Sequence, residues 1–384
     1  MTSKILLGTT ALAAILLSTG AQAADEGLKL KLGGFFQGFA MIGNVDRNDG
    51  VDNFRNVSFE SWNSEIWFTA EAETANGLKY GFRIELEGAS VADQIDESYL
   101  WVSGSFGRVM FGNDDGVGNS MAYQIPTVTR SKSLRIEDQD YAPTANINGS
   151  HLLTAFNSPN HYALDASKLA YTTPRLAGFQ FGVSYAPDLS EDPGTAAPGT
   201  AVAGGFETDN DNQAGDALEF GLNYNNKFGD LGLIASVTYY HDQLEDGAAA
   251  TSADRQSVAA GAGITYKGFS FGANYMWTDN YRSAGYGNAG RKNVDLNQFL
   301  VGAQYVTGPW SFGANAGWGV ADGKSNAAAG NSEDKLFAGL VGVGYNLAPG
   351  IELEAGVQYY DWSSDINARE ADATVGLVGT TLSF

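Results

Sequence analysis

Hydrophobic and polar residues alternate along most of this chain. In GLKYGFRIELEG, every second residue from Leu78 to Leu86 is apolar, while Lys79, Arg83 and Glu85 lie at positions between them. The segments ALEFGLNYNNKF, GFSFGANYMWTD and WSFGANAGWG divide in the same way, and the last two share the run SFGAN. Successive side chains of a β-strand point to opposite faces, so each segment predicts a strand with one apolar face and one face in water.

Sixteen segments of this kind follow one another along the chain, so the sequence predicts an all-β protein. Each is roughly ten residues or longer, the length that a tilted strand needs to cross a membrane. Their number is even, as in a closed antiparallel barrel whose two chain ends lie on the same side. The predicted strands start near Leu28, Asn63, Leu78, Ile95, Phe106, Ser167, Gly178, Gly215, Leu231, Asp254, Gly268, Val294, Pro309, Asp334, Gly350 and Asp372.

The connections between these segments are alternately short and long. The short ones are rich in Gly, Pro and Asn, as tight turns are, and include TANG, GSFG, KFGD, TGP and APG. The long ones are polar and acidic, such as DQLEDGAAATSADR and ADGKSNAAAGNSED. A soluble sandwich has no reason to alternate in this way. The pattern therefore predicts a transmembrane β-barrel with short periplasmic turns and long external loops.

One connection is much longer than the others. It runs from about 113 to 166, follows the fifth predicted strand and shows little periodicity. Structureless loops of this length inside a compact domain are usually functional. We therefore expect this segment, which is the third of the long connections, to have a functional role.

The first residues have the features of a secretory signal peptide. Lys4 precedes an apolar run from Ala11 to Leu17, and Ala21 and Ala23 flank Gln22 in the A-x-A pattern of a cleavage site. The alternative is a membrane anchor, but the apolar run is shorter than the roughly 20 residues that a spanning helix needs. We expect residues 1–23 to be removed and residues 24–384 to form a single barrel domain.

The composition excludes some kinds of chemistry and argues against some kinds of partner. The chain has no cysteine, which excludes disulfides, thiolate chemistry and cysteine metal sites. Its formal net charge is −22, and loss of Lys4 with the signal peptide would leave 21 basic against 44 acidic residues, or −23. Such acidity argues against nucleic acid and anionic lipid surfaces as partners.

Three stretches resemble the Gram-negative general porins, in particular those of alphaproteobacteria. They are FGRVMFGND, LAYTTPRLAGFQFGVSYAP and the terminal GLVGTTLSF. The resemblance implies a sixteen-stranded barrel, usually a homotrimer, with the third external loop folded into the pore. It also implies that the terminal aromatic Phe384 is read by the barrel assembly machinery. One departure concerns charge: many porins place an arginine after the glycine of the fifth strand, but here Asn113 follows Gly112.

Charged residues near the third loop are candidates for the pore constriction. The alternation places Arg83 and Arg108 on the water-facing side of their strands. An alternative is that both form ion pairs within the wall, or that the loop carboxylates are simply solvated, and the loop also carries basic residues. The acidic candidates opposite the arginines are Asp114, Asp115, Glu137, Asp138 and Asp140.

These observations favour an outer-membrane porin for passive diffusion of small hydrophilic solutes and ions. Much of the negative charge would line the lumen and vestibules, which predicts a mild cation preference. One alternative is a solute-selective porin with a binding site at the constriction loop. Another is a structural or adhesive surface barrel. We expect outer-membrane lipid and lipopolysaccharide as its surroundings.

Two further chemistries fit the sequence less well. The acidic runs NVDRNDG, TDNDN and NDDG resemble fragments of calcium loops but lack the spacing of a complete one, so calcium is an accessory expectation and no other cofactor is expected. Hydrolysis would need a base, and His151, His161 and His241 stand in no recognisable catalytic motif. We therefore expect no enzymatic activity.

Overall fold

The computed structural model describes residues 27–48, 50, 55–61, 63–88, 95–137, 153–189, 214–244, 253–281, 294–323, 332–366 and 369–384. The expected signal peptide and the candidates Asp138, Asp140 and His151 lie outside these residues. Within them, no helix is both long enough and apolar enough to cross a membrane.

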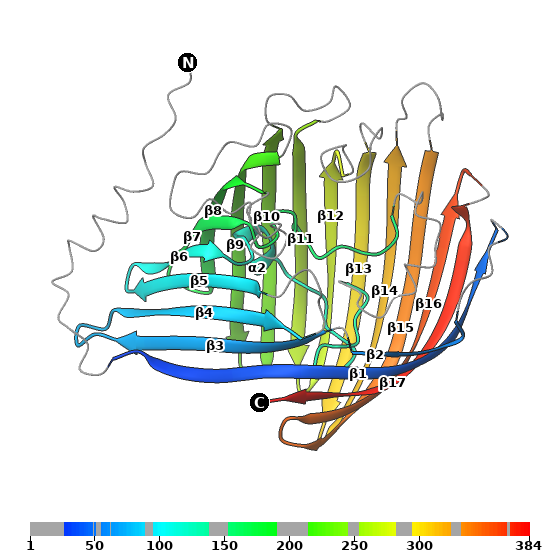
Figure 1. The fold of residues 1–384 in the computed structure, drawn as a ribbon, viewed down its shortest axis with the longest axis horizontal. Helices are drawn as coiled ribbons and strands as arrows, with labels where there is room; N and C mark the ends of the chain where they lie inside the picture. The colour runs from blue at the N-terminus through cyan, green and yellow to red at the C-terminus, as the bar shows by residue number, and fades with distance from the viewer. Residues whose placement is uncertain are drawn as a thin grey trace.

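The described residues form one antiparallel sheet around a single short helix (Figure 1). The elements are β1 (Lys29–Arg47), β2 (Val57–Glu60), β3 (Ser64–Glu73), β4 (Lys79–Glu87), β5 (Ile95–Gly104), β6 (Gly107–Asn113), α2 (Val117–Ser120), β7 (Ser167–Thr172), β8 (Phe179–Asp188), β9 (Ala214–Phe228), β10 (Leu231–Leu244), β11 (Arg255–Tyr266), β12 (Phe269–Asp279), β13 (Val294–Thr307), β14 (Trp310–Gly323), β15 (Ser332–Ala348), β16 (Ile351–Ser364) and β17 (Ala371–Ser383).

The sheet closes on itself. From β3 onward each strand pairs with its neighbour in sequence, and β17 pairs with β1 from Phe35↔Ser383 to Arg47↔Ala371. Figure 1 shows β1 and β17 side by side at this seam. Since β2 and β3 both pair with β1, they are two parts of one strand, and the barrel has sixteen strands. The predicted fold is confirmed.

The second strand is interrupted by a β-bulge that the sequence pattern did not reveal. Phe36 pairs with Ser64 and Phe39 pairs with Glu60, so the register of the pairing with β1 shifts by one residue between these two positions. An extra residue of this kind bends a strand and breaks its alternation. The prediction therefore began this strand near Asn63 and did not assign β2 to any element.

The barrel is apolar outside and polar inside, the reverse of a soluble protein. In β9, Phe220 and Leu222 are 38% and 49% exposed, whereas Glu219, the residue before Phe220, is 2% exposed. In β12, Phe271 is exposed on the outer face and Asn274 is buried on the inner face. An outer face of this kind is stable against lipid, where the apolar side chains lose nothing by exposure.

The short connections are true hairpin turns. Tyr266 pairs with Phe269, which leaves Lys267 and Gly268 as the two turn residues, with φ values of +46° and +86°. Positive φ at both positions is the geometry of a turn that matches the twist of the flanking strands. The strands can therefore follow one another with two-residue links at this end of the barrel.

Candidate functional site

The third loop packs against the inner face of the barrel, and its described parts are residues 114–137 and 153–166. Its apolar side chains are buried together with residues of β1 and of β11 to β17 in one core cluster; the loop members are Ile125, Val128, Leu134, Ile136, Leu153 and Phe156. In Figure 1 this segment runs within the outline of the barrel. Part of the lumen is thus an apolar core formed by the loop and the wall.

Glycines on the inner wall make room for the loop. A Cβ atom at Gly272 would lie 1.9 Å from Oη of Tyr123, and one at Gly313 would lie 2.5 Å from Cα of Val128. Real Cβ atoms do not approach other atoms so closely. Glycine is therefore needed at these positions because a larger residue would collide with the loop, and not because of the backbone conformation. The alternating segments therefore carry glycines that mark the path of the loop.

Polar side chains of the wall hold the first part of the loop through its backbone. Ser184 of β8 accepts a hydrogen bond from the amide of Val117 at 3.0 Å, at the start of α2. Ser236 of β10 accepts one from the amide of Tyr123 at 2.6 Å. These bonds satisfy backbone donors that the barrel interior would otherwise leave without partners.

The loop tip is held by two glutamates of β16. Glu352 accepts hydrogen bonds from the amides of Arg130 at 3.2 Å and Ser131 at 2.6 Å. Glu354 accepts one from the hydroxyl of Thr129 at 2.7 Å, and both glutamates are buried. Hydrogen bonds to an ionised acceptor are stronger than neutral ones, so these contacts define where the tip lies.

The tip extends as far as a periplasmic turn. The guanidinium of Arg130 donates to the carbonyl of Gly308, in the turn between β13 and β14, and to the carbonyl of Trp310 at 3.2 Å. The chain therefore enters the barrel after β6 at the external end and contacts the wall near its opposite end.

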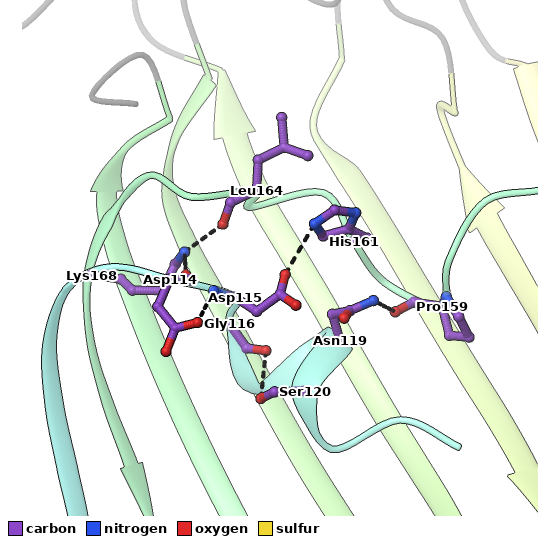
Figure 2. Close-up of polar contacts among 9 residues, drawn as sticks. All are labelled: Asp114, Asp115, Gly116, Asn119, Ser120, Pro159, His161, Leu164 and Lys168. Carbon is purple, nitrogen blue, oxygen red and sulfur yellow. Dashed lines mark hydrogen bonds and ion pairs between the residues drawn. The ribbon is translucent and has the colours of Figure 1, made fainter. Parts of the chain in front are cut away.

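The two ends of the loop meet in a polar cluster at its base, which Figure 2 shows in close-up. His161 Nε2 lies 3.0 Å from Oδ1 of Asp115. Lys168 of β7 donates to the carbonyl of Leu164 at 2.6 Å and to the carbonyl of Asp114. The cluster closes the loop, whose ends are separated by about fifty residues of sequence.

Two carboxyl groups at the loop base, those of Asp114 and Asp165, have raised pKa values. Burial raises the pKa of Asp114 to about 6, with a further contribution from the charge of Asp115. Burial also raises the pKa of Asp165 to about 7, and the charges of Asp96 and Asp115 add to the effect. The protonation of Asp114 and Asp165 therefore changes between about pH 5 and pH 8.

Arg83 lies within an acidic part of the inner wall. Its Nε forms an ion pair with Glu85 and lies 4.0 Å from a carboxylate oxygen of Glu97. Its guanidinium also stacks over Trp67, 4.5 Å from the ring centroid. Nearby, carboxylate oxygens of Glu65, Glu87 and Asp96 lie within 4.8 Å of one another. Arg83 is therefore bound to its own wall and surrounded by carboxylates.

Arg108 occupies a different part of the lumen. It is exposed and lies on the same side of β6 as Met110, which packs against loop residues Val117 and Met121. Its guanidinium lies 5.3 Å from the ring centroid of Trp101. Arg83 and Arg108 thus make separate contacts with aromatic rings of the wall.

The acidic candidates of the loop also lie in different parts of the lumen. Asp114 and Asp115 belong to the base cluster described above. Glu137 is 2% exposed and accepts a hydrogen bond from Asn274 of β12, so its carboxylate faces the wall. Among the described residues, the structure brings no loop carboxylate within ion-pair distance of Arg83 or Arg108. The loop tip instead carries Arg130 and Lys132.

Sequence reasoning did not find the residues that hold the loop. Glu352 and Glu354 alternate with Leu353 in the segment IELEAG, which marks them as inward-facing. Alternation alone gives no sign that their partners lie about 220 residues earlier. The aromatic ring of Trp67 on the inner wall was also not singled out as part of the site.

Comparison with known proteins decides the family. Residues 8–365 match the family of Gram-negative porins. The chain belongs to this family. An uncharacterized protein of Rickettsia prowazekii is 22% identical over 420 residues, which cover 94% of each chain.

Solved porin structures share the fold. An anion-selective porin from Comamonas acidovorans is 16% identical, with a TM-score of 0.57 over 93% of this chain and all of that one. The trimer form of OmpT, an outer membrane protein of Vibrio cholerae, is 13% identical, with a TM-score of 0.56 over 94% of this chain and all of that one. The protein is therefore an outer-membrane channel of the porin type.

Proposed function

We propose that this porin allows passive diffusion of small hydrophilic solutes and ions across the outer membrane. The observation that carries the proposal is a closed barrel with buried polar side chains on its inner face and a long loop packed inside it. A channel of this kind replaces part of the water around a solute with hydrogen-bonding groups of the wall. Diffusion includes no chemical step, so the proposal needs no cofactor and no catalytic residue.

We also propose a mild preference for cations. The chain carries a formal charge of −22, and the acidic part of the wall around Glu65, Glu87 and Asp96 faces the lumen. A negative potential raises the local cation concentration within a Debye length of about 8 Å. Reversal potentials in a salt gradient test the preference, and an anion-selective value would contradict it.

The decisive experiment is conductance of the purified protein in planar bilayers. We expect discrete steps, with closure in groups of three if the protein is a homotrimer. Liposome swelling with a series of sugars provides a second measurement, in which rates should fall smoothly with solute size. Absence of conductance would favour the structural or adhesive alternative, and saturation by one sugar would contradict simple diffusion.

The homotrimer and the surroundings of the barrel are parts of the same proposal. The trimer form of the Vibrio cholerae protein supports the assembly because the two chains share a fold. We further propose lipopolysaccharide at the outer surface, recognition of Phe384 by the assembly machinery and removal of residues 1–23 on export. The mass of the mature protein tests the last point, and crosslinking in native membranes tests the trimer.

A further inference from the structure

A pocket of about 490 Å³ lies between the loop tip and the inner wall near the closing seam. Arg130, Lys132 and Arg135 line it from the loop. Phe35 of β1 and Trp67 of β3 line it from the wall, with ring centroids 5.7 Å apart in an edge-to-face arrangement. The volume lies within the range of small-molecule sites, and the lining combines cations with aromatic surface.

The pocket is positively charged. Its lining contains three basic residues and one acidic residue, Glu352, which gives a net charge of +2. Both carboxylate oxygens of Glu352 accept hydrogen bonds from loop amides, and Ser311 donates to one of them at 3.1 Å. Glu352 thus holds the loop backbone, and its lone pairs are largely used there.

The basic residues differ in how firmly they are held. Arg130 is bound to carbonyls of the periplasmic turn, and its buried Nε has no hydrogen-bond partner in the structure. Lys132 is exposed, and its φ of +67° is rare for a residue other than glycine. Such a backbone conformation persists only where the surrounding contacts enforce it, as Glu352 does for this turn.

We propose that this pocket binds a small organic anion that carries a carboxylate on an aromatic or apolar body. The carboxylate lies against Lys132 and Arg135, and the body lies against the rings of Phe35 and Trp67. This inference rests on the proposed diffusion function and adds a solute class to it. The negative charge of the whole chain attracts cations at the mouths, whereas the loop tip offers a local site for an anion.

Isothermal titration calorimetry of the folded protein in detergent tests the site, with benzoate as the probe. Benzyl alcohol has the same ring without the charge, and acetate has the charge without the ring. We expect benzoate to bind about tenfold more tightly than either, because one charged hydrogen bond or one buried ring contributes this much. Equal affinity for benzoate and benzyl alcohol, or for benzoate and acetate, would overturn the assignment.

Two variants test the residues. The double variant Lys132→Met with Arg135→Gln should weaken benzoate binding about tenfold or more, since it removes both charges proposed to contact the carboxylate. Lys227→Met removes a charge from an exposed end of β9, outside the pocket lining, and should leave benzoate binding unchanged. Equal affinities in the two variants would contradict the site.

Binding and conductance separate this inference from the proposed function. If the protein binds benzoate but conducts no ions, the diffusion proposal is wrong and the binding site is supported. If the protein conducts ions but does not bind benzoate, the binding site is wrong and the diffusion proposal is supported. Heat-modifiable migration on gels verifies that each variant is folded before it is titrated.

Discussion

Single glycines on the inner wall determine how closely the third loop can pack. Gly313 of β14 lies against the backbone of Val128, where a Cβ atom would be 2.5 Å from Cα. A backbone atom cannot rotate away as the end of a side chain can, so the loop itself must shift. We therefore treat Gly313 as a residue that selects the position of the loop.

The variant Gly313→Ala should destabilise the folded protein by about 1–3 kcal/mol, the usual cost of overpacking a core. Urea-induced unfolding in micelles measures this loss. Gly339→Ala is the matched control, because no atom lies closer than 3.9 Å to a Cβ at that position of β15. Equal stability of the two variants would show that the loop tolerates the extra methyl group.

Asp165 is the residue from which we expect a pH response. Burial raises its pKa from the usual 3.8 to about 7, next to Asp96, Asp115, His161 and Lys168. Between these values the native state binds more protons than the unfolded chain. The carboxyl group therefore contributes stability at low pH, and this contribution is lost as the pH rises through 7.

The same ionisation should change ion selectivity. Above pH 7 Asp165 adds a negative charge at the loop base, so cation preference should increase between pH 5 and pH 8. Reversal potentials at several pH values measure the change. In Asp165→Asn this increase should be smaller, and an unchanged pH profile in the variant would assign the response to other groups.

At the scale of elements, strand β16 and the loop tip act as one unit. Glu352 and Glu354 bind the tip through backbone and hydroxyl donors, and both lie on the inner face of the strand. The double variant Glu352→Gln with Glu354→Gln keeps the shape of the side chains and removes their charge. Each lost charge weakens hydrogen bonds that contribute about 1.5–3 kcal/mol.

We expect this double variant to increase open-channel current noise several-fold, because a loosened tip moves within the lumen. Single-channel recording measures the noise. Glu333→Gln is the control: this glutamate of β15, whose side chain is 40% exposed, pairs with Lys335 at 2.7 Å, and surface pairs contribute at most about 1 kcal/mol. If the current noise of the double variant equals that of the unaltered protein, other contacts, such as the apolar core, hold the tip.

Elements were predictable where local patterns determine them. The expected strand starts agree closely with the observed ones, for example Leu231 for β10 and Val294 for β13, because alternation and turn residues are local signals. The β-bulge before Ser64 was missed because it breaks the alternation. The position of the loop tip could not be predicted from the sequence either, because it depends on a contact between Thr129 and a strand residue 225 positions later.

At the scale of the whole molecule, closure of the barrel involves the last residue. The amide of Phe384 donates to the carbonyl of Gly34 at 3.1 Å, and the amide of Gly34 donates to the carbonyl of Phe384 at 3.2 Å. Phe384 is 67% exposed, and Leu382, two residues earlier on the same face of the strand, is 42% exposed, so both lie on the outer face. Phe384 thus adds one residue pair to a seam that already contains thirteen pairs between β1 and β17.

Because Phe384 contributes only one residue pair to the seam, its deletion can distinguish an effect on the stability of the barrel from an effect on assembly in the membrane. Deletion of Phe384 should cost little stability, because backbone hydrogen bonds contribute about 1 kcal/mol each and the other pairs remain. If the terminal aromatic is an assembly signal, the same deletion should reduce folded protein in the outer membrane several-fold. Heat-modifiable protein in membrane fractions measures the second effect, and unfolding of refolded protein measures the first.

The variant Phe384→Tyr keeps an aromatic ring at the terminus and should assemble almost normally, whereas Phe384→Ala should behave like the deletion. Refolded protein of all three variants should conduct as the unaltered protein does, because the terminal side chain lies outside the lumen and the loop contacts are intact. Normal membrane levels of the deletion variant would refute the assembly role. Equal losses in membranes and in refolding would instead assign Phe384 to closure of the barrel.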